Sequence, residues 1–531
     1  MIGVGQGRLL ALLASVALVA STTAACETWT AFRNDQSRTG DQQVVDALSD
    51  PSRVGRLHVV WRFHPPGAIG FTSSPIVPFN GNVYIGNGDG IFYAVDASTG
   101  VEKWHYPGKG ILTSQFTCNP SSFGIASSAT FTFIGVTPVV IFAAPDQSIG
   151  TRLGEGRLFA LNANDGDVVW KSPVLAHITG LTQGSVTEKH EQIGYSSPLI
   201  YGNEVYVGIG NHCDDPIQWG RVVAVNIADG SIDGAFSFAD GLRPGNTSPP
   251  GGDVWGSVAE GGGALYVTTG NQANGQAEPS PSRGLSMLRL DPTTGAVTWQ
   301  KQPVPYVLDG DPDWSATPTY MQASCGNLIV STQKDGWTWA MRDAGTPAWV
   351  FPSDNPSWIN GFAPKDGTVH GDSRYIRPGA AWGDVYVTMD GGEDTISNVF
   401  QGEHRLHALN ACAPDSSRVR WMLDVPDAST FGDPSLGPPT ITNGMVYVGT
   451  DTGHLVVVAD PSISQVPPTH FRCTKDGISN AACVASGFQL VPAPNVLANI
   501  ALDGGIVGEP VIAFHNVYVS TSAGSLYMLD P

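Results

Sequence analysis

Two short apolar runs separated by a Gly-containing turn recur along this chain. The stretch from Met445 to Asp460 shows the pattern in full, with β-branched and aromatic residues on both sides of the turn at Asp451-Thr452-Gly453. Runs of this length and composition predict a β-hairpin. Other copies begin near Val83, Val139, Val205, Leu265, Leu328, Val385 and Val517. These eight copies, spaced by roughly 60 residues, indicate a repeat architecture.

Two further runs flank each hairpin. Several copies continue with Asp or Asn, a turn that ends in Gly, and then Trp, as in Asp96 to Gly100 and Trp104. Before the hairpin, a pair such as Ser74-Pro75 or Glu509-Pro510 introduces another short apolar run. Each repeat therefore predicts four antiparallel strands, and its Trp is expected to pack between neighbouring sheets.

A four-stranded sheet with two apolar faces cannot bury itself, whereas about eight such sheets arranged radially cover one another and form a propeller. An open all-β array is the alternative. The chain ends favour a closed ring, because the last repeat stops at Pro531 with three strands while Leu57–Phe63 is a strand without a repeat of its own. We therefore expect an all-β, eight-bladed β-propeller of four-stranded antiparallel blades, closed by that N-terminal strand.

The charge of the chain limits its partners. The net charge is -20 and only 27 of the 531 residues are basic. Nucleic acid and anionic membrane surfaces require clusters of Lys and Arg, which the sequence lacks. We expect neither a nucleic-acid partner nor electrostatic attachment to a membrane.

Residues 1–25 have the pattern of a secretory signal peptide. They hold one Arg, an apolar run from Leu9 to Ala20, and the small residues Thr23-Ala24-Ala25. Residues 26–531 are then expected to form a single propeller domain in a periplasmic or extracellular protein. Cys26 follows directly and could carry a lipid anchor, although Thr23 stands where lipoprotein signals favour Leu. Attachment to a membrane is expected only in that case.

Six cysteines remain, and an even number in an exported protein favours disulfides. If strands A to D run outward from the centre of each blade, the A–B and C–D connections lie on one face of the ring, here named the A–B face. The B–C and D–A connections lie on the opposite face, named the B–C face. This geometry favours the pairs Cys118–Cys213, Cys325–Cys412 and Cys473–Cys483. Unpaired buried thiols remain an alternative.

The segments between and before the repeats differ in character. The polar stretch Glu27–Pro51 predicts an irregular arm over the protein surface. Longer inserts at Ile111–Gly156, Asn271–Gly284 and Pro461–Asn499 interrupt the second, fourth and seventh blades. Such loops are where a scaffold usually carries specificity.

Four polar or aromatic residues fall on the B–C face of two adjacent blades: Trp255, Asn271, Asp313 and Lys334. The amide oxygen of Asn271 and the carboxylate of Asp313 are hard ligands of the kind Ca²⁺ prefers. The ammonium group of Lys334 can stabilise a developing oxyanion, and the indole of Trp255 is a platform for a planar ring. A quinone bound on Ca²⁺ and facing a carboxylate base would use all four.

Each of these residues also has a plainer interpretation. Asn271, Asp313 and Lys334 stand in sequences that are common in turns. Trp255 is of the type that packs between blades. Only their expected coincidence on one face favours the functional interpretation over four independent structural roles.

At these residues the chain resembles the pyrroloquinoline quinone (PQQ) dependent alcohol dehydrogenases, and most closely their polyvinyl-alcohol dehydrogenase branch. The resemblance extends over nearly everything after residue 25. It includes Trp29-Thr30-Ala31-Phe32, Arg38-Thr39-Gly40, Val54-Gly55-Arg56-Leu57 and the repeated Tyr-Ala-Val-Asp and Phe-Ala-Leu-Asn phrases. Non-catalytic propellers, including outer-membrane assembly lipoproteins, share the repeat.

The resemblance implies a role for each candidate. Trp255 would lie beneath PQQ, Asn271 and Asp313 would bind Ca²⁺, and Lys334 would face the quinone oxygens. Asp313 would also accept the proton of a small or polymeric alcohol while hydride passes to the quinone. Because the chain has no covalent haem motif, a separate electron acceptor such as a cytochrome c is expected.

Two departures from the family pattern stand out. The Glu ligand expected in the B–C connection of the third blade is replaced by Asn211-His212-Cys213-Asp214-Asp215, in which Asp214 could substitute. The adjacent cysteine pair that covers the quinone in many relatives is absent. A propeller that has lost the cofactor, and acts as a binding or assembly scaffold, is therefore the alternative function.

Overall fold

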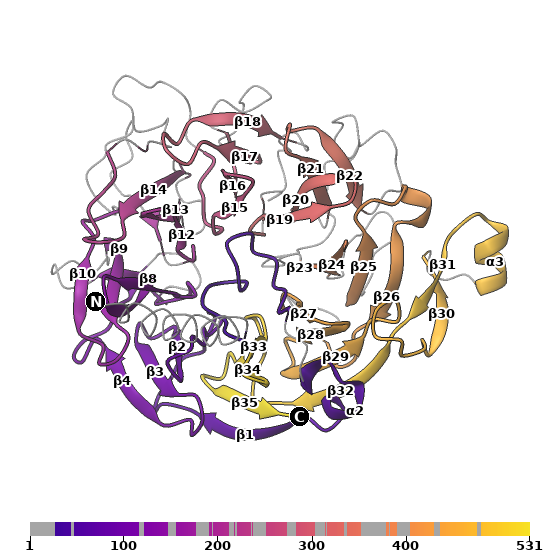
Figure 1. Ribbon diagram of the computed structural model, residues 1–531, viewed down its shortest axis with the longest axis horizontal. Coiled ribbons are helices and arrows are strands. Elements are labelled where there is room, and N and C mark those ends of the chain that lie inside the picture. Colours follow the sequence, from indigo (N-terminus) through magenta and orange to yellow (C-terminus); the bar gives the residue numbers. More distant parts are fainter. Residues whose placement is uncertain are drawn as a thin grey trace, which may run out of the picture.

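Eight antiparallel sheets arranged in a closed ring form the protein (Figure 1). This arrangement confirms the expected eight-bladed propeller. The computed structural model describes residues 27–43, 47–115, 122–146, 155–176, 191–193, 195–211, 217, 220–234, 236, 251–272, 283–302, 314, 316–333, 337–351, 379–381, 383–389, 404–428, 436–474 and 479–531.

Four blades consist of four consecutive strands each, paired in sequence order. Their strands are β7 (Thr130–Ile134), β8 (Thr137–Asp146), β9 (Glu155–Asn162) and β10 (Val168–Lys171) in blade 2, β15 (Ala259–Gly261), β16 (Ala264–Thr268), β17 (Met287–Leu290) and β18 (Val297–Lys301) in blade 4, β19 (Thr319–Ala323), β20 (Gly326–Thr332), β21 (Thr338–Arg342) and β22 (Pro347–Phe351) in blade 5, and β23 (Gly379–Ala381), β24 (Asp384–Met389), β25 (Arg405–Asn410) and β26 (Val419–Asp424) in blade 6.

Blades 1 and 3 each have an inner or outer strand reduced to a bridge. In blade 1 the pair Ile76 and Tyr84 replaces strand A, and in blade 3 the pair Val225 and Ile232 replaces strand D. The regular strands are β2 (Asn82–Gly86), β3 (Phe92–Asp96) and β4 (Glu102–Tyr106) in blade 1, and β12 (Leu199–Tyr201), β13 (Glu204–Asn211) and β14 (Arg221–Asn226) in blade 3. The short strands β5 (Ser114–Gln115), β6 (Ser122–Phe123) and β11 (Glu191–Gln192) lie in connections between blades.

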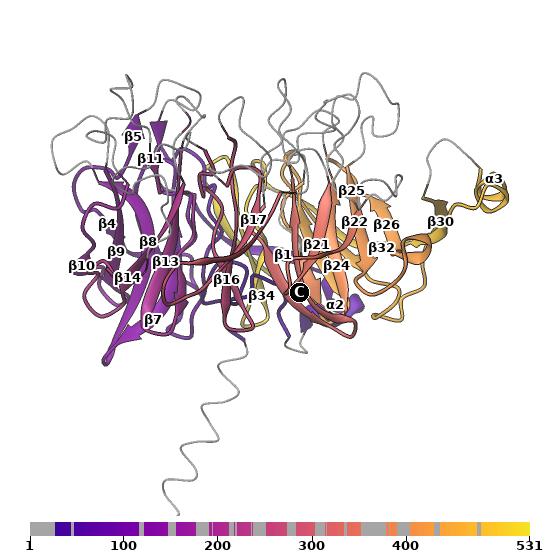
Figure 2. The same cartoon turned by 90° about the horizontal axis from the view of Figure 1, so that it is seen from above.

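An insert extends blade 7, as expected. The blade itself contains β27 (Thr440–Thr442), β28 (Met445–Gly449), β29 (His454–Ala459) and β32 (Asn495–Ala501). Between β29 and β32 the chain forms β30 (His470–Cys473), α3 (Asn480–Ala485) and β31 (Leu490–Ala493). These three elements project beyond the rim of the ring (Figures 1 and 2), and the Cys473–Cys483 disulfide joins β30 to α3.

The N-terminal strand closes the ring. Blade 8 takes β33 (Val511–Ala513), β34 (Asn516–Ser520) and β35 (Leu526–Asp530) from the end of the chain, and β1 (His58–Phe63) from its beginning. Strand β1 pairs antiparallel with β35, with Arg62 opposite Tyr527. Before β1, the short helices η2 (Ala47–Ser49) and α2 (Pro51–Val54) pack against blades 7 and 8 through Leu48 and Val54. The expected closure is confirmed.

Tryptophans of strand D fasten neighbouring blades to each other. The indole N–H of Trp61 donates to Ala97 O (3.0 Å), and that of Trp170 donates to Ile227 O (3.0 Å), each in the C–D turn of the next blade. The glycine of that turn has positive φ and lies against the ring, since a Cβ on Gly230 would stand 2.6 Å from Trp170. Trp104, Trp299 and Trp349 make the same kind of bond. The turn glycine is therefore required both by its backbone conformation and by the indole of the preceding blade.

A chain of hydroxyl groups links the inner strands near the axis. In each link, a backbone N–H of one blade donates to the hydroxyl of the next. The pairs are Glu509 N with Ser74 Oγ (3.0 Å), Ser74 N with Ser128 Oγ (3.0 Å), Ser128 N with Ser197 Oγ (3.0 Å), Ser197 N with Ser257 Oγ (2.8 Å) and Ser257 N with Thr317 Oγ1 (2.9 Å). All are buried, and such bonds contribute about 1 kcal/mol each.

Residues 27–42, named here the belt, run around the inside of the ring (Figure 1). Backbone hydrogen bonds join the belt to the innermost strand, or the turn that follows it, in seven blades. They pair Phe514 N with Glu27 O (3.0 Å), Trp29 N with Val77 O (2.9 Å), Phe131 N with Thr30 O (2.8 Å), Glu260 N with Gln36 O (2.8 Å), Tyr320 N with Ser37 O (2.9 Å), Ala380 N with Thr39 O (3.0 Å) and Ile441 N with Gly40 O (2.9 Å). Blade 3 is reached by the side chain of Gln36, whose Nε2 donates to Ile200 O (2.7 Å).

The prediction of a surface arm is therefore wrong for residues 27–42. Trp29, Arg33 and Arg38 are among the most deeply buried side chains of the described protein. The inner strands present N–H and C=O groups toward the axis, and buried backbone groups of this kind need partners. A polar segment with free carbonyls supplies them, so its polarity reflects burial against strand edges rather than exposure to water.

Two buried arginines anchor the belt in opposite directions. Arg33 pairs with Glu509 through Nη1 and Oε2 (3.0 Å) and also donates to Pro439 O (2.8 Å). Arg38 has no such bridge and donates to backbone carbonyls, including that of Val258 (2.9 Å). Burial lowers the pKa of Arg38 to about 10 and raises the pKa of Asp41 to about 7. Both shifts reflect the loss of water around a charged group.

Disruption of the Arg33–Glu509 pair is expected to destabilise the whole ring. In Glu509→Gln the guanidinium of Arg33 stays buried without its counter-charge, so the free energy of unfolding should fall by about 3–5 kcal/mol. Chemical denaturation measures this change. The control is Arg53→Gln, which removes an exposed pair with Asp50 and should change stability by less than about 1 kcal/mol. Equal effects of the two variants would contradict the anchoring role.

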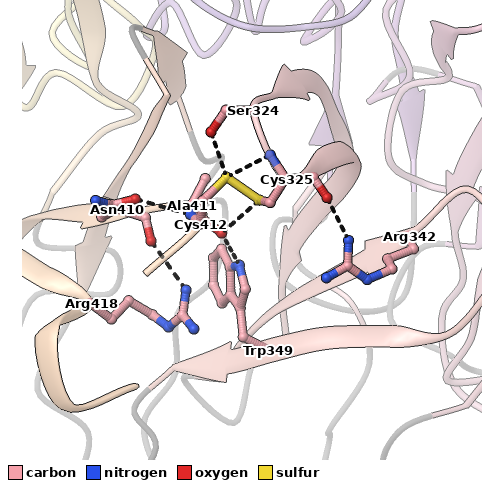
Figure 3. Close-up of a disulfide and its surroundings, with 8 residues drawn as sticks. All are labelled: Ser324, Cys325, Arg342, Trp349, Asn410, Ala411, Cys412 and Arg418. Atoms are coloured by element: carbon pink, nitrogen blue, oxygen red, sulfur yellow. Dashed lines mark hydrogen bonds between the residues drawn. A yellow bond between two sulfur atoms is a disulfide. The ribbon is translucent and has the colours of Figure 1, made fainter. Parts of the chain in front are cut away.

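The Cys325–Cys412 disulfide joins blade 5 to blade 6 on the A–B face (Figure 3). Cys325 lies in the A–B turn of blade 5 and Cys412 in the C–D connection of blade 6, as expected. Beside the disulfide, Trp349 Nε1 donates to Ala411 O (2.9 Å), and the guanidinium of Arg418 lies 4.6 Å from the centre of the Trp349 ring. The Cys325–Cys412 and Cys473–Cys483 pairings are confirmed, whereas Cys118 and Cys213 lie outside the described residues.

The two disulfides should differ in their effect on the ring. The double variant Cys325→Ser, Cys412→Ser removes a link across 87 residues between two blades and should lower stability by about 2–4 kcal/mol. The double variant Cys473→Ser, Cys483→Ser removes a link within the projecting insert and should leave the main unfolding transition nearly unchanged. Thermal unfolding of the oxidised proteins compares them. A larger loss from the second variant would contradict this assignment.

Candidate functional site

The connection that leads into blade 4 lies across the ends of two B strands on the B–C face. Val254 N donates to Ile209 O (3.0 Å) near the end of β13, and Gly252 N donates to Asn271 O (2.8 Å) just beyond β16. A bridge between Gly251 and Gln272 continues this pairing. The backbone of residues 251–256 is thereby fixed between blade 3 and the end of strand B in blade 4.

Two of the sequence-predicted residues, Trp255 and Asn271, are held together by this connection. The indole of Trp255 is half-buried and meets Tyr195 edge to face, with ring centroids 6.1 Å apart. Gly210 allows this approach, because a Cβ there would stand 2.7 Å from Cβ of Trp255. Asn271 is buried just beyond β16, where its carbonyl accepts the hydrogen bond from Gly252 N in this connection. The aromatic platform and the amide are thus parts of one rigid backbone unit.

Asp253 is a buried carboxylate in this unit that the sequence interpretation missed. Its carbonyl accepts a hydrogen bond from Gly270 N (2.7 Å). Its Oδ1 would lie 1.6 Å from a Cβ on Gly270, so the carboxylate occupies the space above that glycine. The glycine before Asn271 was the available signal, since a residue without a side chain marks a close approach by another group.

Blade 5 contributes the neighbouring part of the site. Trp314 N approaches Thr269 O (3.5 Å) in blade 4, and Trp314 also forms a bridge with Gln333 in blade 5. Thr269 donates through Oγ1 to Arg283 O (2.6 Å) and accepts from Ser286 N (2.9 Å). The two contacts of Trp314 therefore join the end of strand B in blade 4 to the end of strand B in blade 5.

Asp214, Asp313 and Lys334 lie outside the described residues, so their assignments stay predictions. The structure therefore brings together Trp255 and Asn271, and it adds Asp253 to them. Within the described ranges, no group of three or more His, Cys, Asp or Glu side chains gathers at a potential metal site.

Two buried ion pairs lie on the B–C side of blades 2 and 3. Arg221 Nη2 lies 2.6 Å from Glu191 Oε2, and Asp146 accepts a contact from Arg157 Nε (3.2 Å) with Lys171 farther away (3.9 Å). Strand β11 places Glu191 opposite Asn211, next to where the family's Glu ligand was expected. Because Glu191 already faces a guanidinium, it fits a structural pair better than a metal ligand.

The described donors fit the chemistry of a cation beneath a planar ring. An amide oxygen at Asn271 and a carboxylate at Asp253 are hard oxygen ligands. The indole of Trp255 offers a flat apolar face on the same backbone unit. Gly210 and Gly270 leave the space in which these side chains lie.

Comparison with known proteins places the chain in a family. The sequence profile of the PQQ family, described as the β-propeller domain of glucose, ethanol and alcohol dehydrogenases, matches residues 29–353, more than half of the chain. The chain belongs to this PQQ dehydrogenase propeller family. The match begins in the belt, at Trp29, and ends just after blade 5.

Two curated quinoprotein dehydrogenases are similar to this chain over part of their length. The quinoprotein alcohol dehydrogenase PedH of Pseudomonas putida is 24% identical over 352 residues, covering 59% of this chain and 52% of the relative. The quinoprotein glucose dehydrogenase of Escherichia coli is 24% identical over 351 residues, covering 58% of this chain and 42% of the relative. The matched region thus spans about half the length of these relatives.

Solved structures share the fold of this PQQ propeller. A europium-containing methanol dehydrogenase has a TM-score of 0.67 at 16% identity, with 95% of this chain and 98% of that chain covered. The quinohemoprotein alcohol dehydrogenase of Comamonas testosteroni has a TM-score of 0.66 at 16% identity, with 97% and 82% covered. BamB of Moraxella catarrhalis has a TM-score of 0.51 at 12% identity, with 90% and 100% covered. The fold is therefore common to catalytic and other propellers.

The helices of the described residues are too short, or too polar, to cross a membrane.

Because Asp253 lies so close to Gly270, a methyl group at position 270 is expected to lower the stability of the protein. In Gly270→Ala the new Cβ would collide with the carboxylate of Asp253, and overpacking of this kind lowers stability by about 1–3 kcal/mol. Gly256→Ala is the matched control, because its nearest neighbour would be 3.5 Å away. Urea denaturation should show a loss only for the first variant. Equal tolerance of both substitutions would show that Asp253 does not occupy this space.

Proposed function

We propose that this protein is an exported quinoprotein that oxidises alcohols and uses PQQ held on Ca²⁺. The observation that supports this most directly is the backbone unit on the B–C face, which joins Trp255, Asp253 and Asn271 in a propeller of the PQQ dehydrogenase family. When bound, PQQ would supply the acceptor for the hydride, which carries both electrons away from the alcohol carbon.

In this proposal each residue has one task. The amide oxygen of Asn271 binds the cation, and the carboxylate of Asp253 adds a second oxygen beside it. Trp255 covers one face of the quinone ring and keeps water from it. By resemblance, Asp313 accepts the hydroxyl proton of the alcohol and Lys334 stabilises negative charge on the quinone oxygens.

Four finer parts of the proposal rest on the sequence and on its resemblance to the family. Asp214 is the carboxylate offered by the third blade in place of the family's Glu. Residues 1–25 direct export to the periplasm or the extracellular space, which agrees with the two disulfides of the described residues. The electrons pass to a separate acceptor such as a cytochrome c, and the substrate is a small or polymeric alcohol, as in the polyvinyl-alcohol dehydrogenase branch.

Reconstitution tests the proposal. The purified protein with PQQ and Ca²⁺ should acquire the quinone absorbance and reduce an artificial dye when an alcohol is added. Asp313→Ala should lower kcat by about 10²–10⁴-fold, the usual contribution of a positioned base. Asn271→Ala should raise the Ca²⁺ concentration needed for activity, and Trp255→Ala should weaken retention of PQQ. A parallel set with a lanthanide in place of Ca²⁺ identifies the preferred metal.

Asp415→Ala is the control, because Asp415 lies on the A–B face in the short helix η6 (Asp415–Ser417), away from the candidate site. It should leave kcat unchanged. If PQQ produces neither absorbance nor dye reduction, and Asp313→Ala behaves like the parent, the enzyme proposal is wrong. The non-catalytic scaffold then becomes the better description.

A further inference from the structure

An exposed apolar patch lies on the A–B face of blades 1 and 2. The half-exposed rings of Phe79 (51%) and Phe133 (46%) stack with centroids 5.7 Å apart, and Phe79 also meets the buried Phe131 edge to face at 5.3 Å. Val136, in the A–B turn of blade 2, is 93% exposed. We name Phe79, Phe133 and Val136 the apolar patch. Apolar side chains that gather at the surface mark a place where a protein binds a partner or a membrane.

The patch projects from the ring on short, well-fixed turns. The two residues Gly135-Val136 join β7 to β8, and this hairpin reaches the lower edge of the ring in Figure 2. Beside Phe79, the side chain of Asn80 donates through Nδ2 to the hydroxyl of Tyr84 (2.6 Å). Because these turns are already ordered, their apolar side chains can enter the surface of a bilayer without a further cost in conformational entropy.

The belt begins on the same blades that carry the patch. Its first backbone bonds are Phe514 N with Glu27 O (3.0 Å) in blade 8, Trp29 N with Val77 O (2.9 Å) in blade 1, and Phe131 N with Thr30 O (2.8 Å) in blade 2. Val77 and Phe131 each stand two residues before a ring of the patch. Phe514 is part of the A–B turn of blade 8, so Glu27 lies at the A–B face. A lipid anchor on the adjacent Cys26 would therefore hold this part of the ring against a membrane.

The charges around the patch favour a neutral lipid surface over an anionic one. The turns at residues 78–81 and 135–136 contain no charged side chain. At the start of the belt, Glu27 Oε1 lies 3.8 Å from His515 Nε2. The exposed Asp165 stands farther out on the same face, in the C–D turn of blade 2. Apolar contact, rather than attraction between opposite charges, is therefore what this surface offers to a bilayer.

We propose that the apolar patch docks the protein on a lipid bilayer, with Phe79, Phe133 and Val136 in the layer between the headgroups and the acyl chains. Burial of their apolar area supplies the free energy. Docking through the A–B face leaves the B–C face, with Trp255 and Asn271, turned away from the membrane. The inference does not depend on the proposed catalytic activity.

The test holds the mature chain, residues 26–531 with Cys26→Ser, on vesicles through an N-terminal hexahistidine tag and a nickel-chelating lipid. Val136→Trp introduces an indole in the patch, and Val484→Trp introduces one on α3, which lies away from the lower edge of the ring (Figure 2). The chain already has 14 Trp, so each signal is the difference from the protein without the added indole. Phosphatidylcholine with brominated acyl chains should quench the indole at position 136 and spare the one at position 484.

Removal of the rings supplies the matched comparison. In the Val136→Trp protein, Phe79→Ser with Phe133→Ser should abolish most of the quenching, because the area that enters the bilayer is lost. The control is Phe471→Ser with Val484→Ser, which removes side chains of the projecting insert that are 50% and 64% exposed, and it should keep the quenching. Measurement of Tm shows that each variant is folded. If the double variant at the rings is not, the single variant Phe133→Ser takes its place and should reduce the quenching.

Lipid composition separates apolar docking from adsorption by charge. At low ionic strength, replacement of part of the phosphatidylcholine by phosphatidylglycerol should weaken the quenching, because the chain has a net charge of -20. Quenching that requires phosphatidylglycerol overturns the proposal, as does equal quenching at positions 136 and 484 or quenching that survives loss of both rings. No quenching at position 136 also overturns it. Sedimentation of the protein without vesicles then shows whether a second copy covers the patch. Failure of PQQ reconstitution would leave all these results unaffected.

Discussion

The inner edge of the propeller is the constraint on which the structure depends. Each innermost strand has one neighbour in its own blade and turns its other edge toward the axis, where its backbone groups would lack partners. In this protein the belt supplies carbonyl groups to that edge, blade after blade, as at Glu260, Tyr320 and Ala380. The strand β1 that follows the belt then closes blade 8. The belt and β1 therefore satisfy the inside of the ring and complete its circumference.

The contacts between blades follow from the same geometry. Near the axis, hydroxyl groups such as those of Ser128 and Ser197 accept a backbone N–H from the preceding blade. Farther out, the indoles of Trp61 and Trp170 bond to turns of the following blade. Each polar bond is worth little by itself, but all point the same way around the ring, and those of the hydroxyl groups are buried. Neighbouring blades are therefore held in position relative to each other both near the axis and toward the rim.

The two faces of the ring are used differently. On the B–C face, the connection into blade 4 carries Asp253 and Trp255 across to Asn271, and small residues at Gly210 and Gly270 make room for it. On the A–B face, the belt leaves an acidic cavity at Asp41. The candidate cofactor site is thus built from connections, whereas the cavity on the A–B face is built from the belt and inner strands of blades 5 and 6.

The sequence predicted those site residues whose position follows from counting the strands of each blade. Trp255 precedes strand A and Asn271 follows strand B of the same blade, so counting strands was enough to put both on the B–C face. Asp253 was not found, because its importance lies in its packing above Gly270, which no repeat position encodes. Glu191 was also missed as the buried carboxylate of blade 3, since its position depends on β11 pairing with the end of β13.

The number of blades, their four-stranded pattern, the closing strand and two disulfide pairs could be predicted from the amino-acid sequence, because each depends on local periodicity and on counting connections. Only the tertiary structure decided where the polar residues 27–42 lie. From their polarity alone, residues 27–42 are expected to bond to water at the surface. Their actual partners are the edges of the inner strands, and those buried edges exist only once eight blades surround the axis. The same reason explains why Arg33 and Arg38, which read as surface residues in the sequence, are buried.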